Sequence, residues 1–300
     1  MPTDRVVSRA LLRCGSERLK LLRVGAPGAE RPAVVNEAGQ IYDASSVTSD
    51  YNGRFFAENG VSLLRQALSE DRLPVIHDEL RIGTPVAKPG KIVCIGLNYV
   101  DHATEAGLEA PIEPVVFLKA PETAVGARDT VLVPRGSSKC DYEVELAVVI
   151  ATRVRYLDSP QSAGDHIAGY CITNDLSERE FQNDRGGQWT KGKSCETFNP
   201  LGPFLVTPDE IADPQDLRLR LWVNGEIRQD GTTADMIFSV DHLIWYLSQF
   251  MTLEPGDVIN TGTPAGVGMG MKPPRYLSAG DVIESEITGL GRHKSVVEQA

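Results

Sequence analysis

Residues 140–149, CDYEVELAVV, place two carboxylates in a segment that otherwise has the pattern of a buried strand. Val144 separates Glu143 from Glu145, and an unbroken apolar run follows from Leu146 to Ile150. Side chains two residues apart in a strand point to the same face, so the two carboxylates lie together while Val144 faces the core. Because buried carboxylates are costly unless they are paired, this segment needs a partner from elsewhere in the chain.

A divalent cation is one such partner, and an all-oxygen ligand set favours Mg²⁺, Mn²⁺ or Ca²⁺. The alternative is the solvated outer face of an edge strand. A second apolar segment, GYCITND, ends in Asp175, which is a candidate third oxygen ligand. The same aspartate is also a candidate N-cap for a short helix that starts at Leu176.

Two further segments carry residues with catalytic potential. In LNYVDHATEAG, His102 and Glu105 are three residues apart and lie on one side of a predicted helix. A carboxylate beside an imidazole is the arrangement of a general base, although an exposed polar pair fits the spacing equally well. In RGGQWTKGKS, Trp189, Lys191 and Lys193 are crowded among glycines, and a solvated loop with two lysines is the alternative.

The segment NTGTPAGVGMG is a glycine-rich loop after a strand, with Thr261 and Thr263. It has neither the lysine of a P-loop nor the following helix and acidic residue of a dinucleotide fingerprint. A nucleotide site is therefore not expected here. Backbone N–H groups of such a loop remain suited to binding a substrate carboxylate.

Short apolar strands separated by Gly, Pro and polar residues dominate the chain after Lys91, with Asn224-Gly225 predicting a two-residue hairpin turn. Helices are predicted over 61–70 and 238–250, and a further one opens within SPQSAGDH at 159–166. The pattern indicates an α+β fold that is mostly β, with mixed and largely antiparallel strands. We expect a small N-terminal α+β domain over residues 1–85 and a larger domain over 86–300, and assign no role to the stretch before Lys20.

The formal net charge of −11 argues against nucleic acid or an anionic membrane surface as a partner. No apolar run approaches the roughly 18 residues that a spanning helix requires, and the N-terminus lacks the apolar core of a signal peptide. The five cysteines, which are scattered and odd in number, fit neither a disulfide framework nor a zinc site (Cys14, Cys94, Cys140, Cys171 and Cys195). A cytoplasmic, reducing location is expected.

Taken together, these motifs resemble the fumarylacetoacetate hydrolase superfamily, from about Arg81 to the C-terminus. The segments that carry the resemblance occur in the family's order: GLNYVDHATE (96–105), DYEVELAVVI (141–150), NDLSEREFQ (174–182), RGGQWTKGKSCETFNPLGP (185–203) and INTGTPAGVG (259–268). The N-terminal KLLRVG and ERPAVV segments resemble the small domain of the bacterial isomerase and acylpyruvate hydrolase branch. The resemblance implies a mixed β-roll and a homodimer.

The resemblance also implies a role for each site residue. Glu143, Glu145 and Asp175 match the metal ligands, for Mg²⁺ or Mn²⁺. The catalytic dyad matches His102 and Glu105, on a segment that often closes as a lid, and Lys193 matches the active-site lysine. The substrate-binding positions fall on Arg179, Gln182 and Thr263. Some members have a further Asp ligand where this chain has Ile95, so three carboxylates and waters are expected around the metal.

The family acts on small 2-keto acids through a metal-bound enolate. The resemblance therefore implies a metal-dependent hydrolase that cleaves a C–C bond in an acylpyruvate or another 2,4-diketo acid. Decarboxylation of oxaloacetate and isomerisation or decarboxylation of a 2-hydroxydienoate reach the same enolate and remain alternatives. The substrate's distal group is left open by the sequence.

Overall fold

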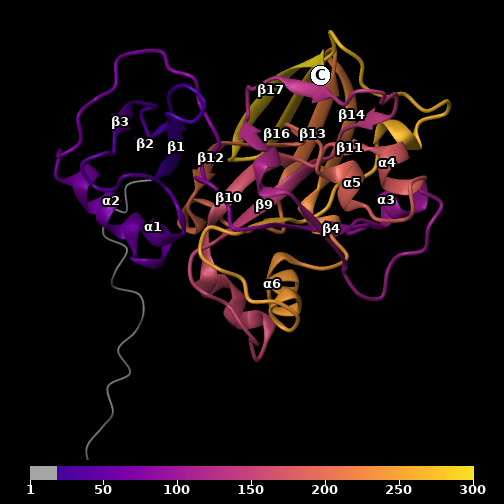
Figure 1. Cartoon of the computed structure of the whole chain (residues 1–300). Helices are drawn as coiled ribbons and strands as arrows, with labels where there is room; N and C mark the ends of the chain where they lie inside the picture. Colours follow the sequence, from indigo (N-terminus) through magenta and orange to yellow (C-terminus); the bar gives the residue numbers. More distant parts are fainter. Residues whose placement is uncertain (1–18) are drawn as a thin grey trace, which may run out of the picture.

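The computed structural model describes residues 19–300. Residues 1–18, which include Cys14 and nearly all of the stretch that was assigned no role, lie outside the described residues. The fold is α+β and mostly β, as predicted, and is built on one large mixed sheet and a smaller second sheet (Figure 1). No helix within residues 19–300 is long and apolar enough to cross a membrane.

The large sheet has ten strands. In spatial order they are β3 (Ile41–Asp43), β2 (Arg31–Val35), β1 (Lys20–Val24), β12 (Asn199–Val206), β10 (Ile167–Asn174), β9 (Val144–Ile150), β15 (Val258–Asn260), β4 (Ile92–Gly96) and β5 (Val115–Lys119), with β6 (Ala124–Gly126) alongside β12. Most neighbours are antiparallel, whereas β15–β4 and β12–β6 are parallel pairs. Strand β9, which contains Glu145 and directly follows Glu143, is therefore a central strand of the sheet, between β10 and β15.

The second sheet has five strands and packs against the first. Its order is β14 (Glu226–Thr232), β13 (Arg218–Val223), β16 (Val282–Ile287), β17 (Gly291–Gln299) and β7 (Val131–Val133); a separate two-stranded ribbon joins β11 (Ser177–Glu178) to β8 (Cys140–Asp141). The hairpin between β13 and β14 turns at Asn224-Gly225, as predicted, and both residues have the positive φ values that a type I′ turn requires.

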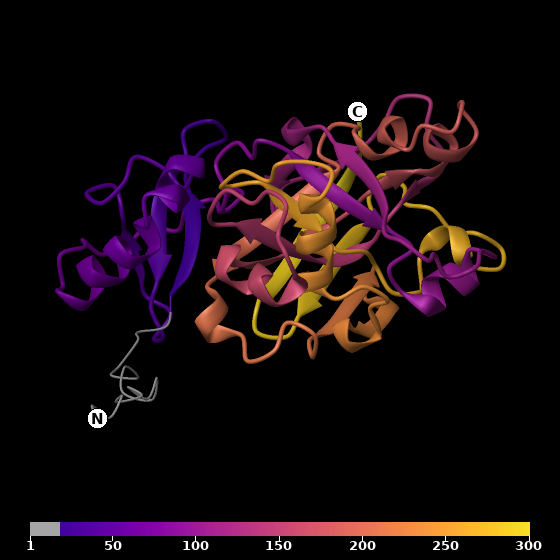
Figure 2. The same cartoon turned by 90° about the horizontal axis from the view of Figure 1, so that it is seen from below.

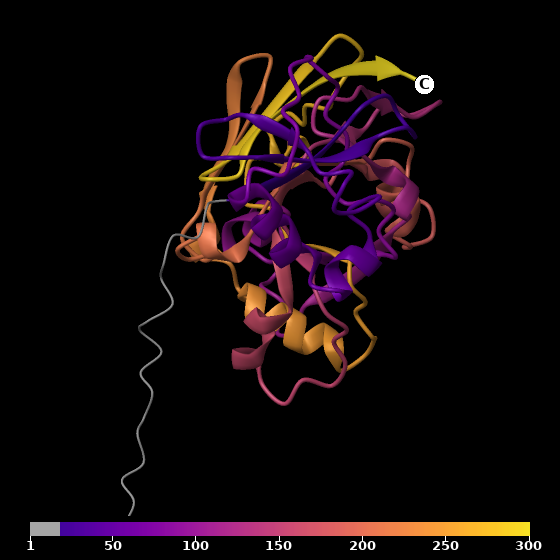
Figure 3. The same cartoon turned by 90° about the vertical axis from the view of Figure 1, so that its left-hand side faces the viewer.

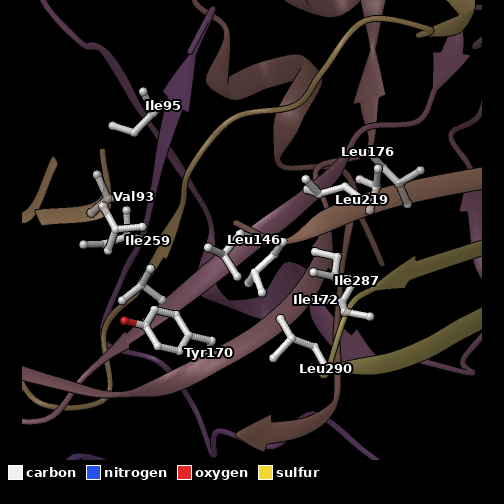
Figure 4. Packing of buried hydrophobic residues seen from close by; sticks show 14 of the residues in the cluster. Val93, Ile95, Leu146, Tyr170, Ile172, Leu176, Leu219, Ile259, Ile287 and Leu290 are labelled. Carbon is white, nitrogen blue, oxygen red and sulfur yellow. The ribbon is translucent and has the colours of Figure 1, made fainter. Parts of the chain in front are cut away.

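Strand β9 is buried on both faces, which explains its unbroken apolar sequence. Leu146 and Ile172 pack with Leu219 and Ile287 of the second sheet in the main core (Figure 4). The opposite face carries Ala147 in another apolar cluster, and strand alternation places Glu143 and Glu145 on that face. The predicted orientation, with Val144 in the core and both carboxylates turned away from it, is what the structure has.

The N-terminal strands lie at one end of the molecule together with α1 (Gly53–Ala57) and α2 (Gly60–Ser69) (Figures 1 and 2). Strand β1 pairs with β12, so these strands extend the large sheet, and Leu21 shares a core cluster with Ala147. The division of the chain near residue 85 stays a prediction.

The remaining helices are short: α3 (Val100–Glu105), α4 (Arg179–Asn183), α5 (Thr190–Lys193), α6 (Val240–Ser248) and the 3₁₀ turns η1 (Pro121–Thr123), η2 (Pro160–His166), η3 (Pro208–Glu210), η4 (Thr233–Asp235) and η5 (Gly268–Gly270). Helix α6 lies at the end opposite β16 and β17 (Figures 1 and 3). The helix expected in SPQSAGDH is a 3₁₀ segment. The alternative role of Asp175 as a helix cap is wrong, because a helix begins only at Arg179 and Glu178 caps it.

Candidate active site

The ends of two neighbouring strands bring the three predicted metal ligands together. Glu143 directly precedes β9, Glu145 lies within it, and Asp175 directly follows β10, which is antiparallel to β9. The Asp175 N–H donates to the Glu143 carbonyl at 2.9 Å, which fixes the two segments to each other. One carboxylate oxygen from each residue lies within 4.8 Å of the others, and all three side chains are buried.

Three cations compensate these carboxylates. Lys193 Nζ donates to Glu143 Oε2 at 2.7 Å and to Asp175 Oδ2 at 2.8 Å. Arg179 Nη2 forms an ion pair with Glu143 Oε1 at 2.7 Å. Lys119 Nζ, which is also buried, donates to the other Asp175 oxygen. The structure thus supplies basic partners for Glu143 and Asp175, while Glu145 has no lysine or arginine bonded to it among the described residues.

The two glutamates differ in their acidity. Burial works against ionisation of Glu143, but Lys193 and Arg179 outweigh it and lower its pKa to about 2. Burial raises the pKa of Glu145 well above its usual range, and the charges of Asp175 and Glu143 raise it further. The Gly262 N–H, 2.8 Å from Glu145 Oε2, acts in the opposite direction. A divalent cation would supply the positive charge that Glu145 lacks, so the three-carboxylate donor set fits Mg²⁺ or Mn²⁺.

Helix α3 presents the predicted dyad to the same region. His102 Nδ1 lies 3.6 Å from Glu105 Oε2, and the imidazole is buried, so the pair is not an exposed surface pair. Glu105 is held in place by the Gly266 N–H, at 3.1 and 3.0 Å from its two oxygens. A Cβ at Gly270 would lie 2.1 Å from Glu105 Cδ, which shows why a glycine stands there. The glycine-rich loop therefore orients the dyad.

The close approach of two short helices places Lys193. A Cβ at Gly192 would lie 2.4 Å from the Glu178 carbonyl oxygen and 2.5 Å from the Gln182 nitrogen, so only glycine lets α5 contact the start of α4. Lys193 is consequently buried against the carboxylates. Lys191 of the same motif is exposed, and its ammonium donates to the Arg185 carbonyl.

The predicted substrate-binding side chains are also brought together. Gln182 Oε1 accepts a hydrogen bond from Arg179 Nη1 at 3.1 Å. Thr263 is buried nearby, where its hydroxyl donates to the Val144 carbonyl at 2.8 Å and accepts from Gln229 Nε2 at 2.7 Å. Its hydroxyl hydrogen is thus in use. To donate a hydrogen bond to substrate, as its predicted substrate-binding role implies, the Thr263 hydroxyl would have to give up its bond to the Val144 carbonyl.

The sequence reasoning missed two buried charged residues. Asp141 accepts hydrogen bonds from Arg179 Nε at 2.8 Å and from the N–H groups of Gly268 at 2.7 Å and Met269 at 3.0 Å. Lys119 bonds Asp175 from the end of β5. Lys119 closes the apolar run VVFL, which is a signal that could have found it. Asp141 follows the polar stretch RGSSK and Cys140, so no comparable signal marks it.

These residues meet at a pocket with a volume of about 270 Å³. Glu143, Glu145, Lys193, Arg179, His102 and Thr263 line it, together with Gln182 and a set of apolar side chains. Asp175 and Glu105 contact the lining residues Lys193 and His102 from behind. Residues of α3, α4 and α5 line the pocket, and Figure 1 shows these three helices on the same side of the molecule.

Residues 91–298 match the family described as fumarylacetoacetate (FAA) hydrolase C-terminal. The chain belongs to the fumarylacetoacetate hydrolase family. A Burkholderia multivorans relative, named only as a candidate hydrolase, is 50% identical over 283 residues, which cover 94% of this chain and all of the relative. The family's fold confirms the mixed β-roll expected from the sequence.

Two solved structures in this family are informative for the pocket. Maleylpyruvate hydrolase from Sphingobium sp. SYK-6, in complex with manganese(II) and pyruvate, is 29% identical with a TM-score of 0.76 and covers 94% of this chain and 99% of its own. The 2-hydroxyhepta-2,4-diene-1,7-dioate isomerase from Mycobacterium marinum is 31% identical with a TM-score of 0.73 and covers 94% of this chain and 98% of its own. The family therefore contains both reaction types.

Proposed function

We propose that this protein is a divalent-metal-dependent hydrolase that cleaves the C–C bond of an acylpyruvate or another 2,4-diketo acid. The observation that carries the proposal is that candidate metal ligands and a candidate general base line the same pocket. Glu143 and Glu145 line it with Lys193, and His102, backed by Glu105, lines it as well. Cleavage by water needs an electrophilic group that polarises the substrate and a base that activates the water, and the pocket has residues suited to each role.

Glu143, Glu145 and Asp175 would hold Mg²⁺ or Mn²⁺, and a metal of this kind supplies Lewis-acid polarisation of a 2-oxo group when it is bound. The maleylpyruvate hydrolase that this chain resembles was solved in complex with manganese(II) and pyruvate, which supports this assignment. Lys193 and Arg179 would place positive charge and N–H donors beside an oxyanion that develops on the 2-keto acid. Gln182, bonded to Arg179, keeps the guanidinium oriented.

His102 is suited to take the proton from a water molecule. Glu105 faces Nδ1, so it favours the tautomer that carries its hydrogen there and leaves Nε2 free to accept a proton. The Nδ1–Glu105 separation of 3.6 Å is longer than a hydrogen bond, and such contacts often tighten only when substrate is bound. The water would attack the distal carbonyl, and the departing three-carbon unit would be protonated as pyruvate or a related 2-keto acid.

The similarity to an isomerase keeps a second candidate in view, namely oxaloacetate decarboxylation or isomerisation or decarboxylation of a 2-hydroxydienoate. Decarboxylation of oxaloacetate does not require attack by water, so the variant His102→Ala separates it from hydrolysis. We expect His102→Ala to lose hydrolysis of acetylpyruvate by about 10²–10⁴-fold while keeping any oxaloacetate decarboxylation. Equal loss of both reactions would contradict the role given to His102.

We also propose that the protein is a homodimer, as the family resemblance implies. Light scattering coupled to size-exclusion chromatography tests this directly. A mass of twice the 32.6 kDa of one chain is expected, and a monomer mass at working concentrations would refute it.

A further inference from the structure

The charged residues that line the pocket or lie behind it determine how many substrate carboxylates the site can neutralise. Four buried carboxylates, Asp141, Glu143, Glu145 and Asp175, face three buried cations, Lys119, Lys193 and Arg179. One divalent cation and one substrate carboxylate would bring this group to neutrality. A second carboxylate on the substrate would be left uncompensated, with Glu105 a further negative neighbour behind His102.

Among residues 19–300, the lysine and arginine side chains that line the pocket are Lys193 and Arg179, and both are already bonded to carboxylates. The nearest basic residues in the sequence point to other partners. Arg185 pairs with Glu180 at 2.7 Å, and Lys191 donates to a backbone carbonyl. No basic side chain among the described residues is therefore free in the pocket to receive a second substrate carboxylate.

The rest of the lining is mainly apolar. It consists of Ile95, Gly96, Leu97, Ala106, Leu108, Phe117, Trp189 and Met269, with the neutral amide of Asn183. Trp189 and Phe117 form one wall, with ring centroids 5.4 Å apart in an edge-to-face arrangement. Trp189 packs so closely over Gly96 that a Cβ there would lie 2.6 Å from its ring. This lining is suited to an alkyl or aryl group.

Leu97 is held in this wall by an uncommon backbone conformation. Its φ is 56°, in the left-handed region that residues other than glycine rarely adopt. The bend follows β4, and the next residue, Asn98, anchors the turn by donating to the Thr261 carbonyl at 2.7 Å. The turn places the apolar side chain of Leu97 in the pocket. A polar or basic side chain at this position would be better suited to a substrate with two carboxylates.

From these observations we infer that the substrate carries a single carboxylate, on its pyruvyl end, and a neutral alkyl or aryl acyl group at its distal end. This inference rests on the proposed hydrolase function. It separates this chain from relatives whose names specify dioate or maleyl substrates, each of which has a carboxylate at both ends.

The test compares two acylpyruvates that differ only in the charge of the distal end. Succinylpyruvate ends in a carboxylate, and 4-methylpentanoylpyruvate ends in an isopropyl group of the same branching and similar size. With the full chain and saturating Mg²⁺ or Mn²⁺, kcat/KM should be at least about tenfold higher for the isopropyl compound. Equal or faster turnover of succinylpyruvate would overturn the inference and leave the hydrolase function standing. Turnover of neither compound, nor of acetylpyruvate, would overturn the function itself.

A positive charge introduced into the apolar lining should largely cancel the preference. Leu108 lines the pocket but is 52% exposed, so Leu108→Arg should fold, and Ile112, 96% exposed and outside the lining, supplies the matched control Ile112→Arg. We expect Leu108→Arg to raise kcat/KM for succinylpyruvate by about tenfold and Ile112→Arg to leave the ratio of the two substrates unchanged. The same gain in both variants would attribute the effect to general charge attraction and contradict the role of the lining.

Discussion

Replacement of Asp141 tests how the active-site arginine and the glycine-rich loop are held in position. Asp141 is fully buried and accepts hydrogen bonds from Arg179 and from the Gly268 and Met269 N–H groups, so it joins the active-site arginine to the loop that orients Glu105. In Asp141→Asn the amide group has one acceptor oxygen, and its NH₂ must face one of these donors. Removing the charge of one partner of a buried ion pair lowers the free energy of unfolding by about 3–5 kcal/mol.

For a protein of this size, a loss of about 3–5 kcal/mol lowers the melting temperature by roughly 5–8 °C. The effect on catalysis should exceed the effect on folding, because displacement of Arg179 and of the loop by about 1 Å costs on the order of 10²-fold in rate. We therefore expect kcat for acetylpyruvate to fall by about 10²-fold in preparations that remain folded by circular dichroism.

Asp257 provides the matched control. It is a fully buried aspartate that accepts two backbone N–H groups, from Lys91 at 3.0 Å and Glu254 at 2.6 Å, and it pairs with the Lys91 ammonium group. Asp257→Asn should destabilise the protein to a similar extent but leave kcat within about twofold below its melting transition. Equal losses of kcat in the two variants, or an unchanged melting temperature in Asp141→Asn, would refute the reasoning.

The remaining predictions concern the metal site and pH. Glu145→Gln should stabilise the metal-free protein by about 1–3 kcal/mol, because it removes a buried carboxylate that burial and the charges of Asp175 and Glu143 disfavour. The same variant should lose the rise in melting temperature that Mn²⁺ gives the wild type, and an undiminished rise would contradict its role as a ligand. Burial lowers the pKa of His293 from 6.5 to about 4, although the hydrogen bond to the Gly202 carbonyl opposes this. The unfolded chain therefore binds a proton first, and stability should fall as pH drops from 6.5 towards 4, by about 3 kcal/mol. Urea titrations at pH 7 and pH 4 should show this loss in the wild type and a smaller one in His293→Gln; equal losses would exclude His293 as the cause.

The fold class follows from local patterns in the sequence. The roles of Lys193, Arg179, Gln182 and Thr263 came instead from the resemblance to the family. The alternation around Val144 predicts which face holds the carboxylates, and the hairpin turn at Asn224-Gly225 follows from backbone preferences of two residues. The ranges of the short helices were harder to predict. SPQSAGDH contains Pro160 and Gly164, and it forms a 3₁₀ segment that packs against α6, far along the chain.

The missing parts of the site are contacts between distant segments. Lys119 lies 56 residues before its partner Asp175, and Asp141 lies 127 residues before Gly268. Neither partner can be assigned from spacing alone. The engagement of the Thr263 hydroxyl by Gln229 likewise depends on β14 packing against the glycine-rich loop, which no single segment of sequence specifies.

The central claim is that Glu143, Glu145 and Asp175 hold a metal on which C–C bond hydrolysis depends. The most direct measurement is the turnover of acetylpyruvate to pyruvate and acetate by protein stripped with EDTA and then titrated with Mn²⁺, alongside Glu143→Gln and Asp175→Asn. We predict that activity is lost on stripping, returns at about one Mn²⁺ per chain, and does not return in either variant although both remain folded. Hydrolysis that survives EDTA in the wild type and persists in both variants would contradict the account.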